Sequence, residues 1–95
     1  MPIETIPFVA EDYFGTHEEQ AGLVADALDS GDIAYLIHAI GIVVRARGMS
    51  EVAKATGLSR QALYAAFGPK GNPTISTVMK VLNCLGMSLA LKKAA

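Results

Sequence analysis

The chain has 95 residues, which allows one small domain with a single hydrophobic core. Its 52% apolar and 18% charged residues exclude a disordered tail, and its single cysteine excludes an internal disulfide. The uncharged run in the apolar middle of the chain, residues 33–44, is shorter than the roughly 20 residues that cross a bilayer, and the N-terminus is acidic where a signal peptide would be basic. We therefore expect a cytoplasmic protein that does not contact a membrane.

The net charge of −1 conceals an uneven distribution of charge along the chain. Residues 1–32 contain eight acidic and no basic residues, a balance of −8. Residues 33–95 contain eight basic residues and one acidic residue, Glu51, a balance of +7. Because a basic surface attracts phosphates and an acidic surface repels them, the two parts suggest different partners. The alternative is that the acidic part only improves solubility.

Residues 1–15 contain two prolines and a glycine among apolar and acidic side chains, a composition that disfavours a helix. We interpret them as an extended N-terminal arm, followed by one domain over residues 16–95. The aromatic side chains of the arm, Phe8, Tyr13 and Phe14, either pack against the domain or a second copy, or contact a partner protein.

Two helices are predicted after the arm. Thr16 and Glu19 form a capping-box pattern that predicts a helix over residues 17–29. Asp32 is placed to cap the next helix, residues 33–47, which is apolar around most of its circumference and is therefore expected at the centre of the domain. The apolar positions expected to face the core are Leu23, Val24, Ala27 and Leu28 in the first helix, and Ile33, Leu36, Ile37, Ile40, Val43 and Val44 in the second.

Residues 49–68, MSEVAKATGLSRQALYAAFG, have the spacing of a DNA-binding helix-turn-helix. Ser50 is placed to cap a first short helix, and Gly57 to end it, because glycine enters the left-handed conformation without a Cβ clash. Ser59 is placed to cap a second helix whose apolar side chains recur at three- and four-residue spacing. An ordinary helical hairpin within a bundle is the alternative, since hairpins also favour a glycine turn.

The remaining residues predict a loop, a helix and a tail. The two glycines and two prolines of residues 68–74, GPKGNPT, indicate fixed turns. Thr74 is placed to cap the last long helix, which Gly86 ends. Its buried stripe is expected to comprise Ile75, Val78, Val81, Leu82 and Leu85. Residues 87–92 suggest a short strand or a loose last turn, and a strand would have to pair with the arm or across a dimer.

Residues 45–89 carry the short sequences ARG-MS, TGLSR-LY, GNPT and VLN-LG, and residues 26–41 read DALDSGDIAYLIHAIG. In these segments the chain resembles the addiction-module antidote proteins, small HigA-like antitoxins of the lambda-repressor-like, Cro/C1-type helix-turn-helix class. The resemblance covers most of the chain and is weakest in residues 1–15. It implies an all-α, five-helix domain that binds operator DNA as a dimer, represses its own operon and neutralises a small RelE-like toxin that cleaves mRNA.

The resemblance also implies roles for individual residues, because in this class the second motif helix enters the major groove with its N-terminal residues toward the bases. The base-reading residues are then Ser59, Arg60, Gln61 and Tyr64. The residues on the phosphates are Ser50, Lys54, Lys70, Asn72 and Thr74. Ala65 and Ala66 offer no hydrogen bonds to bases or phosphates, so the reading surface is narrow and a homodimer on a palindrome is expected.

A toxin that cleaves RNA needs positive charge to hold its substrate, and an acidic antitoxin segment complements that charge. The residues expected to contact the toxin are Phe8, Tyr13, Phe14, Glu18 and Glu19. The alternative function is a stand-alone phage or mobile-element transcription regulator that has no toxin partner. A helical interaction module that has lost DNA binding is disfavoured, because positions 60, 61 and 64 hold neither acidic nor obstructive side chains.

An enzyme is not expected, because the sequence offers neither a nucleophile paired with a base nor paired carboxylates in a cleft. His38 has no second metal ligand at a useful spacing, and we expect it to be a hydrogen-bonded core or rim residue. Cys84 falls in an apolar helical stretch and is expected to be a buried, reduced thiol. We therefore expect no metal and no cofactor.

Overall fold

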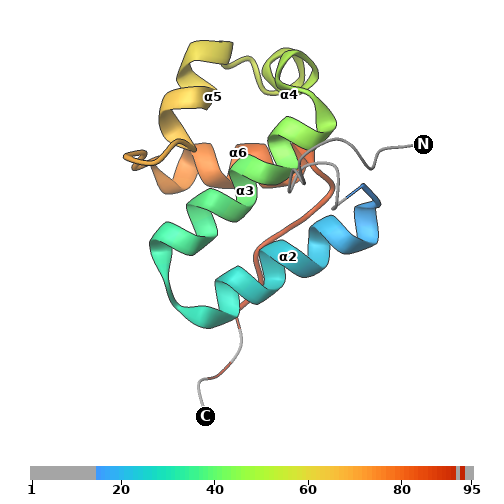
Figure 1. Ribbon diagram of the computed structural model, residues 1–95, viewed down its shortest axis with the longest axis vertical. Helices are drawn as coiled ribbons and strands as arrows, with labels where there is room; N and C mark the ends of the chain where they lie inside the picture. The colour runs from blue at the N-terminus through green and yellow to red at the C-terminus, as the bar shows by residue number, and fades with distance from the viewer. Residues whose placement is uncertain (1–14, 92, 94–95) are drawn as a thin grey trace, which may run out of the picture.

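The computed structural model describes residues 15–91 and 93, and this part of the chain contains five α-helices and no β-strand (Figure 1). The helices are α2 (His17–Ser30), α3 (Ile33–Arg47), α4 (Met49–Thr56), α5 (Arg60–Ala66) and α6 (Ile75–Cys84). The all-helical prediction is confirmed for the described residues. Most of the arm predicted at residues 1–15 lies outside them, so the arm stays a prediction.

Polar side chains fix the ends of α2 and the start of α3. The hydroxyl oxygen of Thr16 accepts a hydrogen bond from the Glu19 N–H at 3.1 Å, and the Glu19 carboxylate accepts one from the Thr16 N–H at 3.2 Å. Gly31 ends α2 in the left-handed conformation, with a φ of 75°. The carboxylate of Asp32 then accepts a hydrogen bond from the Tyr35 N–H at 3.2 Å and caps α3. The predicted caps of both helices are confirmed.

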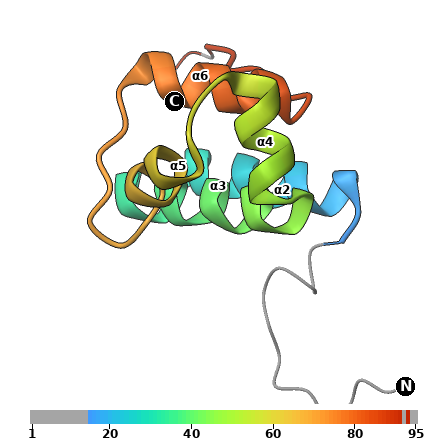
Figure 2. The same cartoon turned by 90° about the horizontal axis from the view of Figure 1, so that it is seen from above.

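The central element is α3, as its apolar sequence predicts. Its buried residues are Ile37, Ala39, Ile40, Gly41, Ile42, Val43 and Val44. It lies between α2 on one side and the pair α4 and α5 on the other (Figure 1), and α6 packs against α4 (Figure 2). A Cβ at Gly41 would lie 2.8 Å from the carbonyl oxygen of Phe67, so a small residue here allows the end of α5 to approach α3 closely.

A single residue, Gly48, joins α3 to α4 and serves as the cap of both helices. Its φ of 105° and ψ of 120° belong to a region of backbone conformation that favours glycine. The axes of α3 and α4 are bent by 102° at this joint. Among the described residues no single helix has both the length and the apolarity to cross a membrane, and α3 and α4 meet those criteria only when counted together.

Three side-chain hydrogen bonds join different elements of the fold. The Arg47 guanidinium at the end of α3 donates to the side-chain oxygen of Gln20 in α2 at 2.5 Å, and to the backbone carbonyl of Leu85 after α6 at 3.1 Å. Gln20 is only 2% exposed. In the α2–α3 hairpin, the Tyr35 hydroxyl donates to the Asp26 carboxylate at 2.8 Å, and this bond raises the pKa of the Tyr35 phenol above its ordinary value.

Three apolar residues that the periodicity assigned to buried faces are exposed, so these assignments were wrong. Leu28 is 41% exposed, Ile33 64% and Ile75 67%. Ile33 and Ile75 are the first residues of α3 and α6, and Leu28 is in the last turn of α2. Helical periodicity predicts the face of the helix on which a side chain lies, but not whether a neighbouring element covers that part of the face. The core comprises Val24, Ile37, Ile40, Val43, Val44, Val52, Leu63, Phe67, Val78, Val81, Leu82 and Leu85.

The chain after α6 turns at Gly86, whose φ of 80° is left-handed, and the Met87 N–H donates to the Leu82 carbonyl at 2.8 Å. Residues 87–91 then run past α2 without regular secondary structure, so the strand considered for residues 87–92 is not formed in them (Figure 1). A strand needs a neighbouring strand for its ladder of hydrogen bonds, and the described residues provide none. Cys84 is half-buried rather than fully buried, and it has a free thiol.

Candidate nucleic-acid interface

The turn between α4 and α5 is held by local hydrogen bonds. Gly57 has a φ of 78°, and its N–H donates to the Ala53 carbonyl at 2.9 Å. The Thr56 hydroxyl donates to the Val52 carbonyl at 2.7 Å and accepts from the Leu58 N–H at 3.3 Å. These contacts confirm the predicted glycine stop and fix the direction in which α5 leaves the turn.

Helix α5 has one buried and one exposed face. Leu63 and the adjoining Phe67 are 1% and 3% exposed, and Ala66 is half-buried against the core. The Ser59 hydroxyl oxygen accepts a hydrogen bond from the Ala62 N–H at 2.9 Å, which confirms the predicted cap. The exposed side chains include all four predicted base-reading residues, Ser59, Arg60, Gln61 and Tyr64. The structure therefore brings these four to one short helix and its cap.

The loop after α5 folds back tightly over the end of that helix. A Cβ at Gly71 would lie 2.0 Å from the Ala66 carbonyl oxygen, and a Cβ at Gly68 would lie 2.7 Å from the Tyr64 carbonyl oxygen. The Gly71 N–H also donates to the Gly68 carbonyl at 2.9 Å. Only glycine fits at these positions without a shift of the backbone. The sequence predicted a loop of fixed turns but not this close approach to α5.

Three of the predicted phosphate-contacting residues follow α5 in this loop and at the start of α6. Lys70 and Asn72 are exposed, and Lys70 lines a shallow hollow of about 490 Å³ together with Tyr64. The Thr74 hydroxyl caps α6 by accepting from the Thr77 N–H at 3.1 Å, as predicted, and it also donates to the Thr77 hydroxyl at 3.2 Å. The structure thus brings Tyr64 and Lys70 together, and the hydroxyl of Thr74 is engaged within its own helix.

The other two predicted phosphate-contacting residues are on α4, and the cap predicted at Ser50 is wrong. The N-cap of α4 is Gly48, and no side chain caps this helix. Because Gly48 lets α4 begin directly after α3, Ser50 is already inside the first turn. Its side chain remains exposed, and Lys54 is exposed in the last turn.

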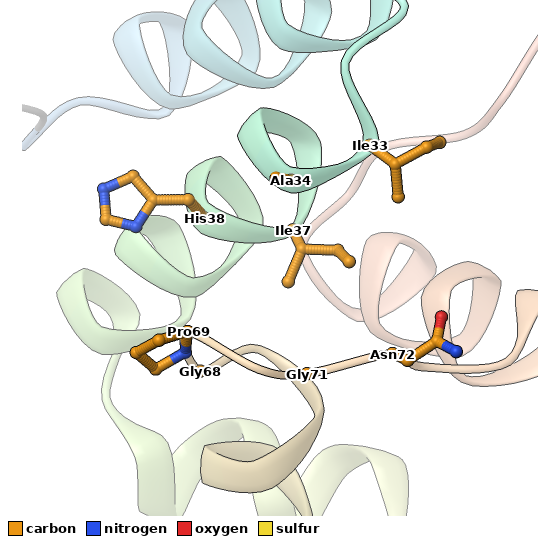
Figure 3. Close-up of a pocket in the computed structure, with 8 residues that line it drawn as sticks. All are labelled: Ile33, Ala34, Ile37, His38, Gly68, Pro69, Gly71 and Asn72. Carbon is orange, nitrogen blue, oxygen red and sulfur yellow. The ribbon is translucent and has the colours of Figure 1, made fainter.

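A second hollow of about 280 Å³ separates the start of α3 from the loop after α5 (Figure 3). Ile33, Ala34, Ile37 and His38 line it from α3, and Gly68, Pro69, Gly71 and Asn72 line it from the loop. His38 is exposed at this rim, which is one of the two locations predicted for it, but the described residues provide no hydrogen bond to its side chain, so that part of the prediction was wrong. In the part of the chain that the structure describes, no three residues of His, Cys, Asp or Glu are grouped as metal ligands.

The residues predicted to contact a toxin are only partly described. Phe8, Tyr13 and Phe14 lie outside the described residues. Glu18 and Glu19 are exposed in the first turn of α2, and the carboxylate of Glu19 also belongs to the capping box. The structure therefore separates these two acidic residues, on α2, from the candidate DNA-facing residues on α4 and α5, with α3 between them (Figure 1).

The fold and the site together define a small all-helical domain that presents a short polar helix and a clamped glycine loop on one face. A family model described as "probable addiction module antidote protein" matches residues 4–93. An uncharacterized protein of Haemophilus influenzae strain Rd is 38% identical over 80 residues, which cover 83% of this chain and 82% of the relative. No solved structure matches the chain. The chain therefore belongs to the addiction module antidote family, which implies an antitoxin role and a toxin partner.

Proposed function

We propose that this protein is the antitoxin of a type II toxin–antitoxin module, that it binds operator DNA as a dimer to repress its own operon, and that its toxin is a RelE-like, mRNA-cleaving protein. The antidote family supports the antitoxin role. The observation that carries the DNA-binding part is the exposed polar face of α5, whose direction is fixed by the turn that precedes it. In this proposal α4 and α5 are the two helices of a helix-turn-helix of the lambda-repressor-like type.

The side chains on α5 have the chemistry that reads bases in the major groove. Arg60 donates two parallel hydrogen bonds to O6 and N7 of guanine, and Gln61 pairs with adenine through its amide. Each such pair gives about 1–3 kcal/mol of discrimination against the wrong base. Tyr64, which is 51% exposed, contacts a thymine methyl group or a phosphate. The hydroxyl proton of Ser59 is available to a base because only its oxygen is used by the cap.

The flanking residues have the chemistry that holds phosphates. Lys54, before α5 in the chain, and Lys70, after it, supply positive charge, and Asn72 supplies an amide donor. Ser50 donates from the first turn of α4. Because the Thr74 hydroxyl is bonded to Thr77, Thr74 contributes through the backbone N–H groups at the start of α6.

A homodimer follows from the small size of this reading surface. Residues Ala65 and Ala66 add no hydrogen-bonding groups to α5, so a single copy reads few bases. Two copies on a palindrome, with half-sites about 34 Å apart along the DNA, double the number of contacts and supply the affinity that one copy lacks.

The DNA-binding proposal is tested with two variants measured against operator DNA and random DNA. Arg60→Ala should reduce the preference for the operator, because it removes a base contact. Lys70→Ala should weaken binding to both DNAs alike and flatten the salt dependence, because it removes a phosphate contact. Equal effects of the two substitutions would refute the division into base-reading and phosphate-contacting residues.

The antitoxin proposal is tested by co-purification of the tagged full-length protein with the product of the adjacent reading frame. A stable complex that also shifts the intergenic DNA supports both the toxin partner and autorepression. DNA binding without a co-purifying partner would instead support the stand-alone regulator.

A further inference from the structure

An apolar groove runs between α2 and the C-terminal segment, residues 86–91. It consists of two adjacent hollows of about 310 and 330 Å³ that share the lining residues Leu28 and Leu89. Ala21, Ala25 and Leu28 line it from α2, and Met87, Leu89 and Leu91 line it from the segment. Among the described residues that line the two hollows, none carries a charge. The core residues Val24 and Leu82 lie at the base of the groove, and none of the described residues that line it is a candidate DNA-facing residue.

Two large apolar side chains that line the groove are exposed to solvent. Leu28 is 41% exposed and Leu91 is fully exposed. Single exposed leucines are common on protein surfaces, but here two leucines line the same hollow, so their exposed apolar surface is available to one partner. Burial of both side chains by a partner would remove apolar surface from water and so stabilise the complex.

One margin of the groove is acidic. Residues 18, 25 and 29 are separated by seven and four positions, so Glu18 and Asp29 lie along the same stripe of α2 as Ala25. Both carboxylates are exposed, and residues 15–32 contain no lysine or arginine. An apolar groove with an acidic margin is complementary to a partner segment that combines apolar side chains with lysine or arginine.

The position of the groove distinguishes between two possible occupants, the toxin and a second copy of the chain. Because α3 separates α2 from α4 and α5, a protein seated in the groove leaves the exposed face of α5 uncovered (Figure 1). A second copy seated there would hold its own α5 on the far side of the assembly. Such an arrangement does not present two α5 helices to half-sites about 34 Å apart on one face of DNA. The toxin is therefore the better occupant.

We propose that the groove between α2 and residues 86–91 is the docking site for the toxin, which inserts a cationic segment with apolar side chains. This inference rests on the proposed antitoxin function and deepens it. Leu28 and Leu91 anchor the apolar side chains of that segment, and the negative charge along this stripe of α2 attracts its basic residues. The predicted toxin contact thus extends from the N-terminal part of the chain along α2 to the C-terminal segment.

The test is Leu28→Lys in the full-length protein, measured by calorimetry against the purified product of the adjacent reading frame. A lysine here repels a cationic segment and removes an apolar anchor. It should not weaken the fold, because α2 has no basic residue in its last turn and a cation near a helix C-terminus is favourable. Met79→Lys is the matched control, since Met79 is 48% exposed on α6 and lies outside the groove. Thermal unfolding of both variants checks that they are folded.

We expect Leu28→Lys to raise the dissociation constant for the toxin at least about tenfold, and Met79→Lys to leave it unchanged. The charge-reversing pair Glu18→Lys and Asp29→Lys should slow association and reduce its dependence on salt. If Leu28→Lys binds the toxin with wild-type affinity, the groove is not the docking site, while the proposed antitoxin function still holds. Loss of self-association in Leu28→Lys with unchanged toxin binding would make the groove a contact between copies and overturn the proposal. Failure of the wild-type protein to bind would refute the antitoxin function, and with it the toxin as occupant.

Discussion

Replacement of Arg47 by leucine should destabilise the fold more than any surface substitution, because Arg47 joins three helices. Its guanidinium donates to Gln20 at 2.5 Å and to the Leu85 carbonyl at 3.1 Å. A hydrogen bond that involves a charged group contributes about 1.5–3 kcal/mol, so Arg47→Leu should lower the free energy of unfolding by about 3 kcal/mol. For a domain of this size such a loss lowers Tm by about 12–24 °C.

The assay is thermal and urea unfolding followed by circular dichroism, with Lys80→Leu as an exposed control that should change stability by less than about 0.5 kcal/mol. The double variant Gln20→Leu, Arg47→Leu should cost less than the sum of its single variants, because each single substitution already breaks the shared bond. A loss below about 1 kcal/mol in Arg47→Leu, or additive costs in the double variant, would refute the reasoning.

Two further predictions follow from the structure. Gly71→Ala should lower the free energy of unfolding by about 1–3 kcal/mol and weaken DNA binding, because the new Cβ would lie 2.0 Å from the Ala66 carbonyl oxygen and displace the loop that carries Lys70. Unfolding and operator-binding measurements check this prediction, and unchanged values in both would contradict it. Tyr35→Phe should lower the free energy of unfolding at neutral pH and much less in strong alkali. The hydrogen bond to Asp26 raises the folded-state pKa of Tyr35, so the stabilisation it gives is present below the ordinary pKa of tyrosine and is lost as the pH rises through the folded-state value. A difference in unfolding free energy between the two proteins that persists unchanged in strong alkali would exclude this explanation.

The sequence predicted those parts of the fold that depend on neighbouring residues. The caps at Thr16, Asp32, Ser59 and Thr74 and the stop at Gly57 depend on hydrogen bonds within one turn, and the residue types at those positions are sufficient to recognise them. The exposure of the polar face of α5 followed in the same way from its helical period.

The features that the sequence did not predict depend on residues that are distant in the chain or on the exact join of two helices. Nothing near Arg47 in the sequence indicates that its partners are Gln20 and Leu85. The cap assigned to Ser50 failed because Gly48 starts α4 without an intervening loop. The closeness of Gly71 to α5 depends on the path of the whole loop, although two glycines in seven residues were a signal that the backbone turns tightly there.

The one-residue joint at Gly48 also determines what a partner has to order when it binds. A flexible linker between α3 and α4 would leave many orientations open, and a partner would lose affinity by restricting them. Here the joint has a conformation that favours glycine, and the helices on both sides of it are packed into the core through Val44 and Val52. The pair α4 and α5 is therefore preorganised, and its association with a partner surface carries little conformational entropy cost from this part of the chain.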